Sequence, residues 1–578
     1  MSALSAGVLA RRCSNRATPA IRDLPHRACT MKTSLPHTLA ALGACAALLA
    51  PLPALAAGPG VPGLDSLIDW RERNLRDDDP KPSDIQLINY FFVRATFTNQ
   101  LADPSGLKGV SLGPFGLITG SSTRTGEGSR TFYVEQRWIP VIAYSPSFAD
   151  GLATFRAQLE IDFTWGLAAN QVQPNQGGGF NADQINVQTK NVNAAITPTR
   201  DPDQLDIILG TQSFYDSVYD PTTTSLFDIV RTGYKLTYLG TDATGVAAYS
   251  KFGGLSKLSF IPIGSAQPDK ASKNDARFAY AYLFTADYAY KLWPGTYIGA
   301  SYWHLKDDTK GAAYAYEGLV KSGPSSTGLG SFTGTARFNM DDPTGHVEYL
   351  GLNFHHNLSF ATSNLSASGF FMYNFGKFKN NKEGSKLLPE VDISGYAANL
   401  ELAYRWGRTN NDLLTLEGMY TSGDADPNDG KYKSAFTMNY YGLPGAVWFN
   451  HKTLLLYPFT STVNNYTGAV TDISNQGYGV TSAILTAAGD IIPNKLNVKI
   501  GAATAQSSAR PQPYAAGGPQ RGRLIGVEGN IEVKYQLRYL MTVGLHAGYM
   551  KKGSFYEGNS QLTSDPWAAF TTFTWYAF

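Results

Sequence analysis

Residues able to perform acid–base or nucleophilic chemistry are scarce and scattered after the first 56 positions. The adjacent His355 and His356 would point to opposite faces if their segment is a strand, so they would not act together. The chain contains no Gly-x-Ser-x-Gly elbow, no His-Glu-x-x-His helix and no phosphate-binding loop. We therefore predict that the protein is not an enzyme. The histidines in this part of the chain are His304, His346, His355, His356, His451 and His546.

Metal ligands and thiols are equally rare. All three cysteines, the last of which is Cys45, lie near the N-terminus, so the rest of the chain has no disulfide, thiolate nucleophile or cysteine metal site. The segment 424–430 carries alternating oxygen ligands that suit a hard cation. However, the position of the closing glutamate in an EF-hand is taken here by Ala435. We interpret the segment as a polar loop, and we expect no metal ion and no other cofactor.

Charged residues that alternate with apolar ones are the remaining candidates for a function. On several segments they share one strand face, opposite a face of apolar side chains. Opposed acidic and basic walls inside a barrel orient polar solutes and tune ion preference. The alternative is that the same side chains form ion pairs that only hold the wall. The candidate pore-lining residues are Arg156, Glu160, Asp162, Asp287, Glu401, Arg405, Glu417, Glu528, Glu532 and Lys534.

The segments that carry these charges have the two-residue period of β-strands. In 155–165 every odd position is apolar and every even position is polar, and 525–535 repeats the pattern with apolar residues or glycine at its odd positions. A short turn then leads to an apolar face within 541–549. Turns at 293–295 and 407–411 join further predicted hairpins. This alternation is typical of strands with one face in lipid and the other in water.

Short turns alternate with long polar connections, such as 171–183, 306–344 and 421–450. In a membrane barrel, one rim carries short periplasmic turns and the other carries long external loops. We therefore predict an all-β transmembrane antiparallel β-barrel over residues 85–578, with about 18 strands and a range of roughly 16 to 20. A soluble sandwich or propeller is the alternative, but aromatic residues at the strand ends favour a membrane interface. The loop 215–232 is interpreted as external, with an inward constriction loop as the alternative.

The composition fits a barrel wall. The 578 residues include 58 Gly, 33 Tyr and 30 Phe but only 16% charged residues, and mean hydropathy is −0.20. After residue 56 no stretch approaches the roughly 20 apolar residues of a transmembrane helix. Without residues 1–56 the chain holds 42 basic and 45 acidic residues. A nucleic-acid-binding protein would show a basic patch or stripe, so we expect no nucleic-acid partner.

Residues 1–56 are predicted to be a signal peptide that is removed. From Met31 a lysine precedes an apolar stretch, and an Ala-x-Ala cleavage site follows at 54–56. Residues 1–30 are rich in arginine, and we interpret them as sequence upstream of the true start at Met31, with a long n-region as the alternative. A lipid anchor on Cys45 and a mitochondrial transit peptide are less favoured, because neither accounts for the cleavage site.

The end of the chain resembles the C-terminal signature of Gram-negative outer-membrane barrels. Phe578 is the last residue, and Tyr576 lies two positions before it on an alternating strand. Thr572 and Thr574 depart from the family, which prefers apolar residues there. The resemblance implies that the barrel assembly machinery recognises the last strand during insertion.

Two further segments, 155–166 and 420–424, resemble parts of the porins of the alginate-export type. This resemblance implies passive transport and leaves the solute open. We therefore predict an outer-membrane porin or channel for small hydrophilic solutes or an exported polysaccharide, in contact with outer-membrane lipid. The alternatives are a structural or sheath barrel around a periplasmic or secreted partner and, less favoured, a hydrolase at the rim. Residues 57–84 are expected to form a periplasmic linker, short helix or partial plug, and a homo-oligomer is compatible with the sequence.

Overall fold

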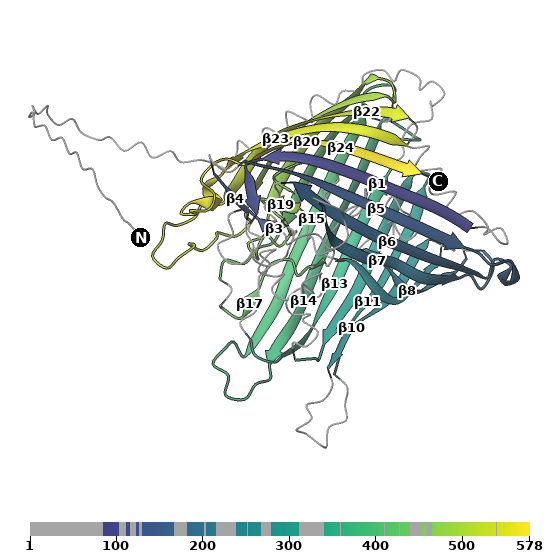
Figure 1. Cartoon of the computed structure of the whole chain (residues 1–578). Coiled ribbons are helices and arrows are strands. Elements are labelled where there is room, and N and C mark those ends of the chain that lie inside the picture. The colour runs from purple at the N-terminus through teal and green to yellow at the C-terminus, as the bar shows by residue number, and fades with distance from the viewer. Residues whose placement is uncertain are drawn as a thin grey trace, which may run out of the picture. The chain divides into compact units, whose positions relative to one another are not determined.

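The computed structural model in Figure 1 describes most of the chain from Ile85 onward. The predicted signal peptide, the segment 57–84 and Phe578 lie outside the described residues. In the described part, no helix is long and apolar enough to cross a membrane. The described ranges are 85–102, 111–115, 123–126, 130–166, 182–201, 204–215, 239–250, 253–266, 279–310, 340–358, 360–409, 411–426, 428–439, 453–457, 465–538 and 540–577.

Eighteen long strands form a closed antiparallel barrel, as the sequence predicts. Each long strand pairs with the next one along the chain, and β24 pairs with β1, from Asn89 opposite Ala577 to Thr98 opposite Ala568. The long strands are β1 (Ile85–Thr98), β5 (Thr131–Tyr144), β6 (Ala153–Gly166), β7 (Ala182–Ile196), β8 (Asp206–Tyr215), β9 (Leu239–Ser250), β10 (Leu255–Ala266), β11 (Ala279–Trp293), β12 (Thr296–Asp307), β13 (Pro343–His356), β14 (Leu365–Asn380), β15 (Glu390–Arg405), β16 (Leu413–Thr421), β20 (Thr481–Ile492), β21 (Leu496–Gln506), β22 (Leu524–Arg538), β23 (Met541–Lys552) and β24 (Trp567–Ala577).

The two rims of the barrel differ in the length of their connections. Beginning with the link between β5 and β6, every second link is short, and the one between β11 and β12 is only Pro294 and Gly295. Gly295 adopts a positive φ of 75°, which the tight turn requires. The opposite rim carries the longer connections, up to 422–480 between β16 and β20. In outer-membrane barrels the short turns face the periplasm, so we refer to the short-turn rim and the long-loop rim.

The predicted alternation is confirmed on most walls. On β6, Phe155 and Leu159 are exposed on the outer face, whereas Gln158 between them is buried on the inner face. Ile525 is an exception, because it was expected on the lipid face but is fully buried. A β-bulge explains the difference: Gln506 pairs with Leu524 and Ala505 pairs with Gly526, which leaves Ile525 unpaired and turned inward.

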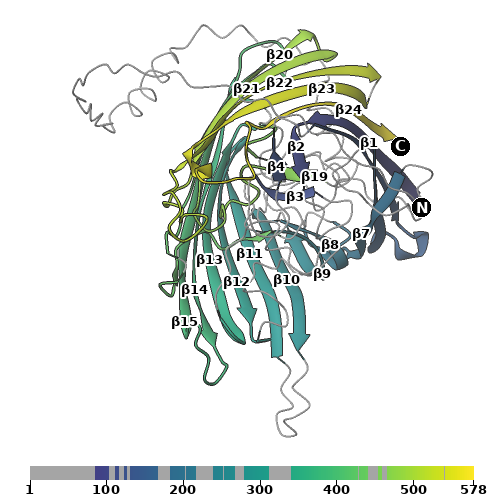
Figure 2. The same ribbon diagram turned by 60° about the vertical axis from the view of Figure 1, so that its left-hand side comes forward.

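Part of the long connections lies inside the barrel. We call 431–437, 453–457 and 465–480 the inserted segments, and most of their described residues are buried, whereas Lys431 and Lys433 are exposed. Figure 2 shows β3 (Ser111–Pro114) and β19 (Asn465–Gly468), which pair with each other, within the ring of long strands. The expectation of an external loop for 421–450 is therefore wrong for its buried part. The remaining short strands are β2 (Gln100–Ala102), β4 (Thr123–Thr125), β17 (Lys431–Tyr432) and β18 (Met438–Asn439).

The alternative constriction loop 215–232 lies outside the described residues beyond Tyr215, the last residue of β8. The described part of the chain places other residues in the lumen instead, and these come from the connections after β1 and after β16.

Candidate functional site

Buried ion pairs line the inner face around the closure of the barrel. Arg137 on β5 forms two hydrogen bonds with the Asp162 carboxylate on β6, at 2.9 and 3.0 Å. The same guanidinium lies 2.9 Å from Glu160 Oε1. One strand further on, Arg94 pairs with Glu135, and both are buried. We call β1, β5, β6 and β21–β24 the seam wall, because they flank the pairing of the first strand with the last.

A second charged cluster lies on the other side of the closure. Glu532 on β22 pairs with Lys499 on β21 and lies 3.0 Å from His546 Nδ1 on β23. The other ring nitrogen of His546 lies 3.0 Å from the Thr572 hydroxyl on β24. Thr572 is thus an inward polar partner, which accounts for its departure from the apolar C-terminal signature. Phe570 joins the two clusters, because it stacks on His546 at 4.7 Å and lies 5.4 Å from the Arg94 guanidinium.

Six of the ten candidate pore-lining residues are at most 4% exposed, and each has a partner in the wall or in the inserted segments. Besides the pairs above, Asp287 accepts a hydrogen bond of 3.0 Å from the Trp303 indole and pairs in register with the buried Lys257. Glu417 accepts a hydrogen bond from the Asn399 amide. For these residues the geometry favours the alternative interpretation, in which the side chains form contacts that stabilise the barrel wall. The six are Glu160, Asp162, Asp287, Glu417, Glu528 and Glu532.

The other four candidates are half-buried on the inner face, toward the short-turn rim. Arg156 lies three residues after the start of β6, and Arg405 ends β15, where it donates a hydrogen bond of 3.0 Å to Asn364 Oδ1. Glu401 and Lys534 complete the group, which we call the vestibule residues. Asp206 at the start of β8 interacts with Arg156 and was missed in the sequence, because β8 shows no clear alternation of charge.

The inner face of β12–β15 is apolar toward the long-loop rim, and we call these strands the crown wall. Its buried inner residues pack against the inserted segments, and the Phe378 ring stacks on Phe436 at 6.2 Å. The Tyr349 hydroxyl donates to Phe436 O at 2.9 Å, and Phe436 N–H donates to Asn374 Oδ1 at 3.2 Å. The expectation that every inner face meets water is therefore wrong for this wall. The core residues of the crown wall include Trp303, Leu305, Val347, Tyr349, Phe378, Val391 and Ile393.

The outer face of the same strand ends is polar. His304 on β12 lies 2.7 Å from Glu348 on β13, and Lys377 on β14 lies 3.0 Å from Asp392 on β15. Toward the short-turn rim, the outer face of β13 changes to exposed apolar side chains such as Leu352. At these strand ends the inner face is apolar and the outer face is polar, as in a protein surrounded by water. The crown wall therefore extends past the apolar band.

The sequence contains a signal for this change. On β12 the apolar even positions are Ile298, Ala300 and Tyr302, and after them the apolar residues are at the odd positions Trp303 and Leu305. The ladder with β11 continues through this point without a bulge, so the phase reversal means that the surroundings change while the strand continues. The same reversal occurs on β13 between Leu350 and Tyr349.

An apolar band surrounds the remainder of the outer surface. Exposed Leu, Ile, Phe, Tyr and Trp side chains occur on almost every long strand, and some occupy the short turns, such as Phe148. A closed barrel satisfies all backbone groups within its wall, so this exposed apolar band is suited to lipid. The chain is a closed antiparallel β-barrel whose outer surface is suited to a lipid bilayer.

Comparisons with known proteins give only distant structural matches. No protein-family model and no curated protein matches the sequence. Solved structures similar to it are outer-membrane porins. Acinetobacter baumannii OccAB1 has 13% identity and a TM-score of 0.44, with 87% of this chain and 99% of that one covered. Pseudomonas aeruginosa OccK2 (OpdF) has 11% identity and a TM-score of 0.43, with 85% and 97% covered. Such low identities concern the fold alone, and the resemblance to alginate-export porins finds no support.

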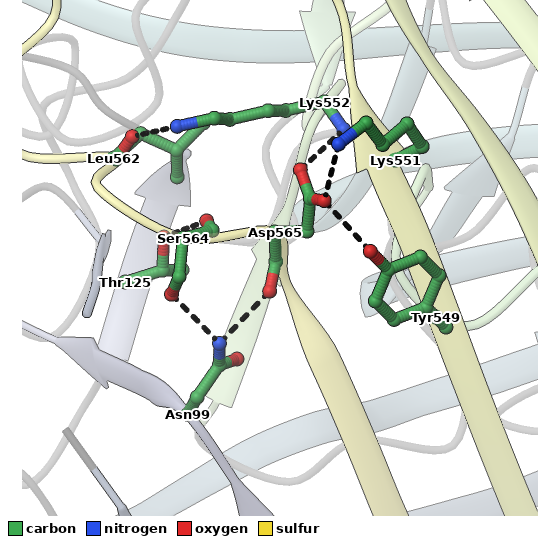
Figure 3. A network of polar contacts seen from close by, with 8 residues as sticks. All are labelled: Asn99, Thr125, Tyr549, Lys551, Lys552, Leu562, Ser564 and Asp565. Carbon is green, nitrogen blue, oxygen red and sulfur yellow. Dashed lines mark hydrogen bonds and ion pairs between the residues drawn. The ribbon is translucent and has the colours of Figure 1, made fainter. Parts of the chain in front are cut away.

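The barrel is fastened at the long-loop rim of its seam by a polar network (Figure 3). Asn99, just after β1, donates to Asp565 O at 2.9 Å and accepts from Trp567 N–H at 2.9 Å. The Asp565 carboxylate accepts from the Tyr549 hydroxyl at 2.7 Å and from Lys551 Nζ at 2.9 Å. Burial raises the pKa of Asp565, but these hydrogen bonds outweigh it and hold the pKa below its ordinary value.

The aspartate-rich segment 424–430 of the barrel forms turns closed by its own side chains. Asp424 accepts hydrogen bonds from the backbone N–H of Asp426 at 2.9 Å and of Lys433 at 3.3 Å. Partial burial raises the pKa of Asp424. Among the described residues, no group of three or more His, Cys, Asp or Glu side chains is placed to hold a metal ion.

Proposed function

We propose that this barrel is a passive outer-membrane channel for small hydrophilic solutes, with a wide polar vestibule at the short-turn rim and a passage narrowed by the inserted segments. The observation that carries the proposal is the division of the inner face along the barrel axis. Toward the short-turn rim the inner face bears half-buried charges, whereas toward the long-loop rim it packs against the inserted segments. A barrel of this strand number is wide enough for an aqueous path even with loops inside.

The vestibule residues Arg156, Glu401, Arg405 and Lys534 are the candidates for contact with a passing solute. They carry both signs of charge and lie on β6, β15 and β22, and charges on the wall of a lumen orient polar solutes and tune ion preference. The inserted segments favour small solutes over an exported polysaccharide, because they occupy part of the cross-section. The same occupancy disfavours a sheath that encloses a separate partner protein.

A hydrolase is the weaker candidate. Thr572, His546 and Glu532 are hydrogen-bonded in the order of a nucleophile, a base and an orienting acid. However, the backbone around Thr572 lies in continuous ladders with β1 and β23, so its N–H groups are engaged and provide no oxyanion hole. The cluster therefore fits a wall-holding role better than a catalytic one.

Conductance in planar bilayers tests the proposal. Purified refolded barrel is expected to give discrete current steps in salt, and substitution of Arg405 by Gln is expected to change the preference for anions over cations. Thr199→Ala, at the exposed short turn between β7 and β8, is the matched control. Absence of steps from correctly folded protein would refute the channel.

The leader 1–56, the linker 57–84 and recognition of the last strand by the barrel assembly machinery remain predictions from the sequence. Mass spectrometry of the mature N-terminus would test the first, with cleavage after Ala56 as the expected result. Native mass spectrometry in detergent would report whether the barrel forms homo-oligomers.

A further inference from the structure

Glu528 on β22 has an unusual set of partners for a carboxylate in a barrel wall. It is 1% exposed, and its oxygens accept hydrogen bonds from three successive backbone N–H groups of an inserted segment. Leu454 N–H donates to Oε1 at 2.6 Å, Leu455 N–H donates to Oε2 at 3.0 Å, and Leu456 N–H also donates to Oε2. The Asn530 side chain adds a fourth donor at 2.9 Å. All four of these partners are therefore donors.

These contacts fix the position of the inserted segment 453–457 against the wall. The neighbouring strand β23 has a glycine beside it, and a Cβ at Gly548 would lie 3.3 Å from Leu454 Cβ. Segment 453–457 is in turn hydrogen-bonded to the inserted segment 465–480, because the Ala469 and Val470 N–H groups donate to the carbonyls of Leu455 and Leu456. One carboxylate thus holds a pair of inserted segments at one side of the lumen.

The segment also forms one side of a polar cavity at the seam. This cavity lies between the inserted segments and strands β1, β5 and β24. Leu454 and Leu455 line it on one side, and Arg94, Gln100 and Tyr133 line it on the other. Movement of the segment away from Glu528 would enlarge this cavity and the passage beside it.

We propose that Glu528 is a proton-sensitive latch that sets the width of the passage by holding or releasing segment 453–457. This regulation rests on the proposed channel function. An ionised carboxylate is an acceptor only and can satisfy several N–H donors at once. A protonated carboxyl group brings a donor of its own into a site already filled with donors, so at least one hydrogen bond is lost. Acidification therefore releases the segment.

The surroundings leave Glu528 as the group that responds to acid. Its register partners on the adjacent strands, Ala503 and Met550, are uncharged. Tyr457 is the ionisable residue of the segment, and both Glu528 and Glu417 of β16 act on it electrostatically. Burial raises the pKa of Tyr457, so its hydroxyl stays neutral. Along β22 the next acid is Glu532, which is already paired with Lys499 and His546.

Protons would reach the latch from the long-loop side. Glu528 lies four residues from Leu524, where β22 starts at the long-loop rim. The test therefore acidifies the bilayer compartment that faces the long loops, from about pH 7 to about pH 4, across the ordinary carboxylate range. Wild-type channels are expected to pass from steady steps to larger, fluctuating ones, and to recover when the pH is restored.

Three variants of the full mature barrel make the test specific. Glu528→Gln keeps the shape but places an amide NH₂ among the donors, so it is expected to show the larger conductance at neutral pH and no further response to acid. Gly548→Val displaces the same segment without changing the carboxylate and is expected to give the larger conductance at every pH. Glu557→Gln, an exposed loop glutamate, is the matched control and should behave like wild type.

Hydrogen exchange supplies a readout that does not depend on current. In Glu528→Gln the amides of 454–456 are expected to exchange about tenfold faster or more, because a hydrogen bond to a charged group contributes roughly 1.5–3 kcal/mol. The latch is refuted if Glu528→Gln retains wild-type exchange and the wild-type response to acid. Failure of every protein to conduct would refute the channel instead, while exchange still tests the latch.

Discussion

The seam wall and the crown wall belong to one continuous sheet but are stabilised in opposite ways. The inner face of the seam wall holds buried ion pairs such as Arg137–Asp162, and its outer face is apolar almost to the long-loop rim, where Phe97 and Phe132 remain exposed. The crown wall has an apolar inner face and a polar outer face over its last residues, for example at His346. The difference shows that the apolar–polar alternation of a strand depends on what surrounds each part of it. Along one strand these surroundings can change from lipid to water.

The two walls also hold the inserted segments differently. The crown wall packs them through a core of aromatic and aliphatic side chains, whereas the seam wall binds them through the Glu528 carboxylate. Apolar packing does not depend on pH, but a buried carboxylate that accepts several hydrogen bonds does. The lumen therefore has a permanent attachment on one side and a releasable one on the other.

The largest expected effect comes from breaking the ion pairs of the seam wall. Arg137→Met leaves the buried Glu160 and Asp162 without their cation, and removal of one partner from a buried pair costs about 3–5 kcal/mol. Urea unfolding in detergent micelles would measure the loss. The combined variant Arg137→Met, Glu160→Gln, Asp162→Asn is expected to recover most of it, because no uncompensated charge remains. Equal stability of the single and triple variants would contradict a role for charge compensation.

The second prediction locates the boundary of the apolar band on the crown wall. Leu352 and His346 lie on the same outer face of β13, but only Leu352 belongs to the apolar band. A lysine deep in lipid costs about 2–4 kcal/mol and one near the interface about 0–1 kcal/mol, so Leu352→Lys should destabilise the barrel in liposomes much more than His346→Lys. Similar losses for the two variants would mean that the end of β13 is not outside the bilayer.

The outline of the fold could be predicted from the sequence because lipid and water impose a strict period of two on each wall. The prediction worked where the environment of each face stays the same along the strand, as on β6 with the exposed Phe155 and the buried Gln158. It failed at Trp303, where the apolar face changes sides because the strand leaves lipid and meets the inserted segments. The phase reversal was visible in the sequence, but the residues that cover the new inner face come from a distant connection.

The candidate site was predictable in its residue types and less so in their roles. Alternation placed Glu160, Glu528 and Glu532 on the polar face of their strands, and all three side chains are buried. Their partners lie on other strands or, for Glu528, in a connection more than 70 residues away. Such partners depend on register and loop insertion, which a single sequence does not specify. The four vestibule residues lie near the short-turn ends of β6, β15 and β22, and which residues fall there depends on where each turn begins.

The smallest expected effect concerns the polar rim network of the seam. Asp565 has a lowered pKa, so its contribution to stability is present above the ordinary value of 3.8 and is lost as the pH falls through the lower value of the folded barrel. Because Lys551 is largely exposed, Asp565→Asn should cost only ~0.2–1 kcal/mol at neutral pH. Thermal unfolding midpoints of the two proteins in detergent should therefore differ at neutral pH and converge on acidification. Glu383→Gln, in the exposed turn between β14 and β15 of the crown wall, is the matched control and should show no difference at any pH. A constant difference for Asp565→Asn at all pH values would mean that its carboxylate does not fasten the seam through its charge.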